Sequence, residues 1–136
     1  MTATINIYSR NFAQGTTECL GYSSYLILVN ADNGKYKVFE ETDSVTEEDT
    51  ELEAVISVLR LIEKMNWNRV YIHTYPNANK WKELLNSPRT LAKEFKELVN
   101  RLSKGRLIRF AGRPDNNLCE KMNDYLERKA VEMGII

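Results

Sequence analysis

The chain has 136 residues and a mass of 15.8 kDa, a length that fits one domain with its own hydrophobic core. With 43% hydrophobic and 28% charged residues, its composition is that of a folded globular protein and excludes a disordered tail. Nineteen Lys and Arg balance nineteen Asp and Glu, so the overall charge requires neither a nucleic-acid nor a membrane partner.

The sequence predicts a cytoplasmic protein without a membrane anchor. The apolar run at 26–29 is far shorter than the ~18 residues that a spanning helix needs. Residues 1–6 contain neither a basic flank nor an apolar stretch, so we expect no secretory signal. Cys19 and Cys119 lie far apart in the chain and are interpreted as isolated, reduced thiols rather than a metal-ligand pair.

The balanced total conceals an uneven distribution of charge. Residues 66–113 carry eleven Lys and Arg against three Glu, a net charge of +8. Such a block indicates either a surface that faces a polyanion or the ordinary solvated sides of two amphipathic helices. Under the first alternative, the expected nucleic-acid contacts are Lys80, Lys93, Lys96, Arg101 and Arg113.

The first third of the chain predicts three strands joined as an antiparallel meander. Residues 5–8 alternate at period two, residues 22–30 are rich in Tyr, Leu, Ile and Val, and residues 35–42 alternate again. The Asp32-Asn33-Gly34 segment between the last two is a strong turn signal, because Asn-Gly readily supplies the positive φ angles of a tight hairpin.

Apolar residues then recur at helical spacing in three segments. The first follows an acidic capping box at 46–49 and ends near Lys64; the second starts at Ser87-Pro88 and ends before Gly105; the third covers residues 118–133. Their apolar stripes are Leu52, Val55, Ile56, Leu59 and Ile62; Leu91, Phe95, Leu98 and Leu102; and Leu118, Met122, Leu126 and Ala130. A short helix is also expected around residues 79–85.

Two more strands are predicted at 69–74 and 106–110, each placed between helices. A meander followed by two helical crossovers predicts a single α/β domain over residues 1–136. Its five-stranded mixed sheet should have the order 3-2-1-4-5, with helices on the faces of the sheet. Ligands of such sheets lie at the carboxyl ends of the central strands, which here are near Ser9 and Tyr75.

Two local sequence motifs add to the information in this element order. The segment Thr50-Glu51-Leu52-Glu53-Ala54 opens the first helix, and Gly112-Arg113-Pro114-Asp115-Asn116 leads through Cys119 to Glu120 at the last one. Together with the element order, they resemble type 1 ribonuclease H over nearly the whole chain. The resemblance implies a ribonuclease H-like fold and hydrolysis of RNA in RNA–DNA hybrids by two Mg²⁺ ions, which about four carboxylates would hold.

Carried over residue by residue, the family's carboxylate set is incomplete. Glu51 matches one metal ligand, and Glu120 stands where an Asp is usual. At the ends of the two central strands, where the family has acidic residues, this chain has Ser9, followed by Arg10, and Tyr75. The resemblance therefore implies a degenerate site in which Glu51 and Glu120 bind a metal weakly if at all. We expect no cofactor, and Mg²⁺ only if some activity remains.

Three functions follow as alternatives. The first is a catalytically inactive domain retained for binding nucleic acid (RNA–DNA hybrid or duplex) or as a scaffold. The second is a residual metal-dependent ribonuclease H, with Glu51 and Glu120 helped by Asp43, Asp49 or Asp115. The third is a protein-interaction module that binds a partner chain. Because a fold alone does not determine function, these alternatives stay open at this point.

The two carboxylates also have ordinary interpretations. Glu51 is a favourable acid in the first turns of a helix, and Glu120 could belong to a solvated stripe with Asp124 and Glu127.

The other polar and aromatic candidates have ordinary interpretations as well. His73 is more typical of a hydrogen-bonded strand residue than of a base, and Trp67 and Trp81 of packing rather than stacking. Asn116 fits either a turn or a group that orients the backbone.

Overall fold

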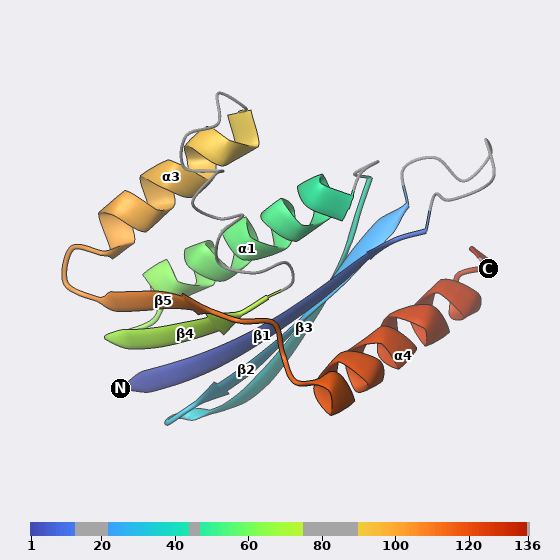
Figure 1. Cartoon of the computed structure of the whole chain (residues 1–136), viewed down its shortest axis with the longest axis horizontal. Coiled ribbons are helices and arrows are strands. Elements are labelled where there is room, and N and C mark those ends of the chain that lie inside the picture. Colours follow the sequence, from blue (N-terminus) through green and yellow to red (C-terminus); the bar gives the residue numbers. More distant parts are fainter. Residues whose placement is uncertain (13–21, 44–46, 75–89, 136) are drawn as a thin grey trace.

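The computed structural model of the chain describes residues 1–12, 22–43, 47–74 and 90–135 (Figure 1). Its strands are β1 (Thr2–Asn11), β2 (Ser23–Ala31), β3 (Gly34–Thr42), β4 (Arg69–His73) and β5 (Leu107–Ala111). Its helices are α1 (Glu47–Lys64), α3 (Thr90–Leu102) and α4 (Asn116–Glu132). Most of these bounds lie close to the predicted elements, but β1 is longer at both ends than the strand predicted at 5–8. The short helix expected around 79–85 and the expected helix start at 87–88 lie outside the described residues.

The strands form one sheet in the order β3-β2-β1-β4-β5, which confirms the predicted topology. β1 pairs antiparallel with β2, and β2 pairs antiparallel with β3. β4 is parallel to β1, and β5 is parallel to β4. In the centre of the sheet, Ile5 of β1 lies between Val29 of β2 and Ile72 of β4. β1 is therefore the central strand, and its carboxyl end extends beyond that of β4.

The β2–β3 hairpin differs in detail from the expected Asn-Gly turn. Asp32 and Asn33 form the turn, and Gly34 is already the first residue of β3, paired with Ala31. Gly34 has a φ of 146°, whereas no described non-glycine residue has a positive φ. The requirement for glycine thus lies at the start of the returning strand, where a Cβ would be strained.

The two faces of the sheet are covered by different helices, as Figure 1 shows: α1 and α3 lie on one side and α4 on the other. Side chains of β1 alternate between them, because successive residues of a strand point to opposite faces. Ile5 and Ile7 belong to the main core with α1 and α3, whereas Tyr8 and Phe12 pack in a second cluster with α4.

The predicted apolar stripes of the helices form these cores. All five stripe residues of α1 are buried, as are Phe95, Leu98 and Leu102 of α3. On the opposite face, Met122, Leu126 and Ala130 of α4 are buried in the second cluster. Each fully buried large apolar side chain contributes about 1.5–3 kcal/mol, so the larger main core supplies most of the hydrophobic stabilisation. None of the described helices has the length and apolar character of a membrane span.

Candidate functional site

The carboxyl end of β1 is where the fold places the expected site. Ser9 pairs with Tyr25 of β2 and follows Ile5 and Ile7 at period two, so its position belongs to the face covered by α1. Arg10 belongs to the opposite face and reaches α4. Tyr75, the other expected position, lies outside the described residues.

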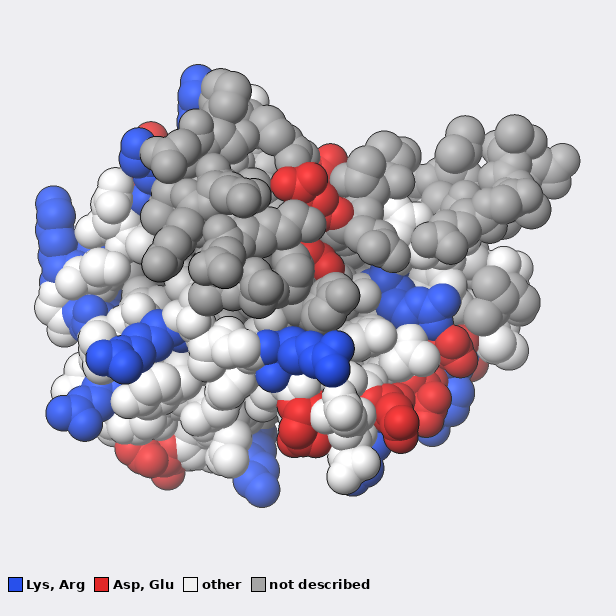
Figure 2. Space-filling view, viewed as in Figure 1, with Lys and Arg blue, Asp and Glu red and all other residues white. Residues whose placement is uncertain are grey.

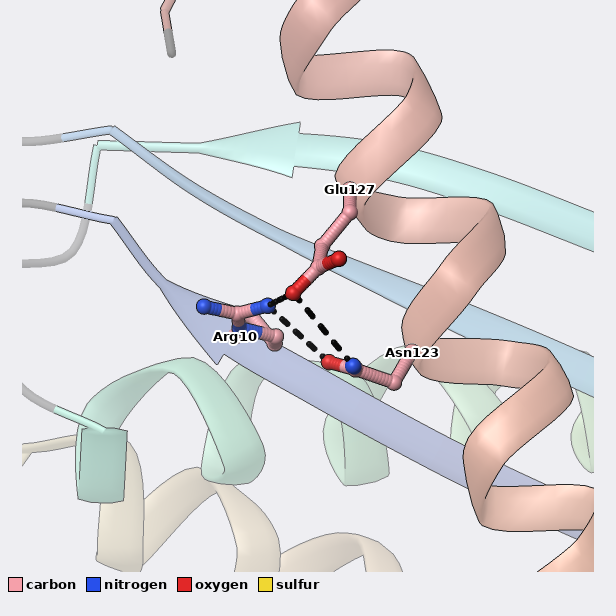
Figure 3. A network of polar contacts seen from close by, with 3 residues as sticks. All are labelled: Arg10, Asn123 and Glu127. Atoms are coloured by element: carbon pink, nitrogen blue, oxygen red, sulfur yellow. Dashed lines mark hydrogen bonds and ion pairs between the residues drawn. The ribbon is translucent and has the colours of Figure 1, made fainter.

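Arg10 is held by two polar residues of α4 (Figure 3). Its Nη1 donates to Oδ1 of Asn123 at 3.0 Å and forms an ion pair with Oε1 of Glu127 at 2.5 Å. Nδ2 of Asn123 donates to the same Glu127 oxygen at 3.4 Å. The guanidinium carbon also lies 4.6 Å from the centre of the Phe12 ring, a cation–π contact. The position next to Ser9 is therefore occupied by a positive charge with a defined orientation.

This three-residue network was not predicted from the sequence. Asn123 and Glu127 are four residues apart on a helix and so share one side of α4. Arg10 stands between Tyr8 and Phe12 on the strand face that meets that helix. The alternation of β1 and the period of α4 were both visible, but the pairing joins residues 117 positions apart and needs the tertiary arrangement.

The two carboxylates that match the family lie on helices that cover opposite faces of the sheet (Figure 1). Glu51, near the start of α1, is buried with 9% of its surface exposed, and Glu120, near the start of α4, is exposed. Of the helper acids, Asp115 caps α4: its Oδ1 accepts a hydrogen bond from the Leu118 amide at 2.9 Å. In the described part of the chain, no three His, Cys, Asp or Glu side chains group closely enough to hold a metal ion.

A pair of Mg²⁺ ions does not fit the donor set at this strand end. Hard divalent cations take anionic oxygen ligands, and two of them bring a charge of about +4. Ser9 supplies no charge, and Arg10 supplies a positive one that is already paired with Glu127. Neither Ser9 nor Arg10 therefore supplies an anionic ligand for a cation at this strand end.

The predicted nucleic-acid contacts fall into three groups. Lys93 and Lys96 of α3 are exposed. Arg101, at the end of the same helix, pairs with Glu63 of α1 at 2.6 Å, and Arg113 donates to Oδ1 of Asn116 at 3.1 Å. Lys80 lies outside the described residues. Figure 2 shows Lys and Arg gathered over the end of the molecule formed by β4, β5 and the end of α3, and Asp and Glu along α4.

The remaining candidates have structural partners. Trp67 is fully buried in the main core, and its Nε1 donates to Oδ1 of Asn33 at 3.4 Å. Nδ1 of His73 lies 3.0 Å from the Gly112 carbonyl oxygen. Cys119 is a free thiol with its Sγ 3.3 Å from the Pro114 carbonyl, and burial raises the pKa of this thiol. Trp81 and Cys19 lie outside the described residues.

The sheet order, the two crossovers and the helix on the far face define a ribonuclease H-like fold. Solved structures with this fold cover almost the whole chain. The N-terminal RNase H domain of Rv2228c from Mycobacterium tuberculosis, solved as a fusion with maltose-binding protein, aligns with a TM-score of 0.61 and 13% identity. That alignment covers 97% of this chain and 98% of the other.

RNase H1 from the halophilic archaeon Halobacterium salinarum also has this fold. It aligns with a TM-score of 0.53 and 9% identity, over 90% of this chain and 91% of the other. No family model matches the sequence, and no curated protein matches it. At such low identity the likeness establishes the fold, and the function has to be argued from the site.

Proposed function

We propose that this chain is a ribonuclease H-like domain that binds nucleic acid, as RNA–DNA hybrid or duplex, without hydrolysing it. The observation that carries the proposal is the end of β1, where Arg10 is paired with Glu127 beside the uncharged Ser9. Neither Ser9 nor Arg10 supplies an anionic ligand for the metal ions that hydrolysis of a phosphodiester would need, whereas binding of nucleic acid needs no such ligand.

The exposed cations of α3 support binding. Lys93 and Lys96 stand off the apolar stripe of that helix, whose buried residues include Phe95 and Leu98. Contacts between such cations and phosphates need no metal, so binding does not depend on the missing carboxylates. Arg101 is less available because Glu63 already pairs with it.

Hydrolysis is tested on a labelled RNA–DNA hybrid with Mg²⁺ or Mn²⁺. We expect no cleavage by the wild-type chain. Metal-dependent cleavage that disappears in Glu51→Gln would show a working ligand set and would establish the residual nuclease instead.

Binding is tested by fluorescence anisotropy with the same hybrid and with duplex DNA. We expect weak binding that fades steeply between about 50 mM and 200 mM salt, because counterion release supplies the favourable free energy. The double variant Lys93→Glu, Lys96→Glu should weaken it about 10-fold or more, whereas Lys121→Glu on α4, a matched exposed control, should not. No binding to any nucleic acid at low salt would overturn the proposal and favour the protein-interaction module.

A further inference from the structure

α4 covers only part of its face of the sheet. The cluster that this helix closes takes strand residues from β1, β2 and β3, namely Tyr8, Leu26, Leu28 and Phe39, together with Phe12 directly after β1. Its described members include none from β4 or β5, and Figure 1 shows α4 beside the carboxyl half of β1, away from those two strands. On the opposite face, Val70 and Ile72 of β4 are buried in the main core, and Ile108 and Phe110 of β5 pack against it.

The strand register aligns the uncovered positions into a row across all five strands. Lys35 pairs with Asn30, Asn30 with Thr4, Thr4 with Tyr71, and Tyr71 with Arg109. Directly beside this row, Asn6 pairs with His73. We call the five residues of the row, together with His73, the open sheet face: Lys35, Asn30, Thr4, Tyr71, Arg109 and His73. Four strand spacings of about 4.8 Å give the row a length of about 19 Å.

The open sheet face has two aromatic rings on β4, next to one edge strand, and cations on both edge strands. Tyr71 is half-buried, Arg109 and Lys35 are exposed, and none of the six residues is acidic. Arg69 flanks Tyr71 two residues away on the same strand face, and neither Arg69 nor Arg109 has an ion-pair partner among the described residues. Asp32 stands at the margin, where its Oδ2 accepts a hydrogen bond from the Thr2 amide.

The ring of His73 is held in place at this surface. Because the Gly112 carbonyl oxygen can only accept a hydrogen bond, the 3.0 Å contact requires the proton on Nδ1. This bond ties β4 to the segment after β5. The ring therefore has a fixed orientation beside Tyr71, separated from it by one residue along the strand.

We propose that the open sheet face binds single-stranded nucleic acid, with bases stacked on Tyr71 and His73 and phosphates contacted by Arg69, Arg109 and Lys35. Exposed aromatic rings on a sheet, flanked by cations, bind unpaired bases because every base has a π-face to stack. Thr4 and Asn30 between them supply hydrogen-bonding groups. A protein partner would instead need a large apolar centre, and the exposed apolar residue here is Leu107, 41% exposed at the edge of β5. The inference rests on the proposed function, since it assigns a ligand and a second surface to a nucleic-acid-binding chain.

The first experiment measures anisotropy of labelled oligo(dT) and oligo(U) of about 12 nucleotides, a length within the usual range of single-strand sites. Tyr71→Ala should weaken binding about 10-fold, whereas Tyr71→Phe, which keeps the ring, should bind like wild type. Tyr36→Ala is the matched control, because Tyr36 is an exposed tyrosine (38%) on the other face of the sheet.

A second variant keeps the test valid if Tyr71→Ala fails to fold. Arg109 is exposed, so Arg109→Ala leaves the core intact. It should weaken single-strand binding and reduce the slope of log K against log salt by about 0.7, the value for one lost phosphate contact on a single strand. Lys64→Ala, an exposed cation at the end of α1, should leave the slope unchanged.

His73 provides a direct reporter, because it is the single histidine of the chain. In proton NMR its ring signals should move upfield on addition of oligo(dT), as expected for a ring under a stacked base. Inorganic polyphosphate, which has charge but no bases, should not cause that shift.

The outcomes separate the two proposals. Loss of single-strand binding in Tyr71→Ala and Arg109→Ala, with the Lys93→Glu, Lys96→Glu variant unaffected, supports the open sheet face. Hybrid binding that responds only to the α3 variants, with no change in the His73 signals, overturns this inference and leaves the proposed function standing. Absence of binding to every nucleic acid overturns both.

Discussion

Arg10 illustrates what a single side chain does at a strand end. Its position on β1 turns it toward α4, and Asn123 and Glu127 fix its guanidinium there. The side chains of Arg10 and Glu127 remain 31% and 46% exposed, so water screens the charges and the pair orients Arg10 more than it stabilises the fold. The strand alternation was predictable, whereas the partner, 117 positions away, was not.

A double-mutant cycle with Arg10→Met and Glu127→Gln measures this pair. We expect each change to lower the free energy of unfolding by about 1 kcal/mol or less, with a coupling of about 0.5 kcal/mol. Urea unfolding at low salt gives the four values, and at about 1 M salt the coupling should vanish. A coupling above about 2 kcal/mol would mean that the pair is shielded from water, contrary to its exposure.

Tyr25 couples stability to alkaline pH. Its hydroxyl donates to Oε2 of Glu40 at 2.5 Å, and burial, followed by that carboxylate, raises the pKa of Tyr25 above its ordinary value near 10. The unfolded chain therefore loses this proton at a lower pH than the folded protein. The resulting stabilisation is complete below about pH 10 and is lost as the pH rises toward the pKa of the folded state.

The variant Tyr25→Phe tests this coupling. At pH 7 it should be less stable than wild type by about 1–2 kcal/mol, because the Glu40 carboxylate loses its donor. The difference should shrink between about pH 9 and pH 11 in urea unfolding, since the wild type alone loses the contribution. Tyr36→Phe, at an exposed position, is the control and should show no such trend. A difference that stays constant or grows with pH contradicts the argument.

At the scale of elements, periodicity was a sound guide. The apolar stripes of α1 and α4 were predicted from spacing alone, and the structure buries Leu59 and Leu126 as expected. The ends of the helices were harder to predict from periodicity. The last helix was predicted to start at residue 118, yet Asn116 is already helical and Asp115 is the N-cap, because a cap depends on one local hydrogen bond rather than on a repeating pattern.

Removing that cap should destabilise α4. Asp115→Ala leaves the Leu118 amide without its acceptor and should cost about 1 kcal/mol, seen as a fall of about 4 °C in the thermal midpoint. Asp115→Asn, which keeps a side-chain oxygen, should be close to wild type. Asn117 is exposed and is the second residue of α4, so Asn117→Ala controls for a general effect of substitution in the first turn. Equal midpoints for Asp115→Ala and Asn117→Ala would show that the cap is unimportant.

At the scale of the whole molecule, the sheet separates two cores of unequal size. β1 contributes to both, while α1 and α3 close the larger core and α4 the smaller one. The sheet order was predictable because a meander followed by crossovers leaves few right-handed arrangements. The open sheet face was not, since it depends on how far α4 reaches across the sheet.

Unequal cores imply unequal local stability. We expect native-state hydrogen exchange to show α4 opening at a lower free energy than α1, because fewer buried side chains hold it. In Leu126→Ala, the backbone amides of α4 should exchange faster than in the wild type, whereas the amides of α1 should exchange at their wild-type rates. Val131→Ala, at a position 58% exposed, should change neither. Identical opening free energies for α1 and α4 would indicate that both faces unfold as one unit.

The uneven charge on the face seen in Figure 2 has a consequence for how the protein adsorbs. Lys and Arg gather over β4, β5 and the end of α3, whereas Asp and Glu lie along α4 together with Lys121, Arg128 and Lys129, and the net formal charge is zero. A basic patch keeps its local field although the total charge vanishes. Near neutral pH the protein should therefore be retained on a cation-exchange resin at low salt, although its net charge alone predicts no retention.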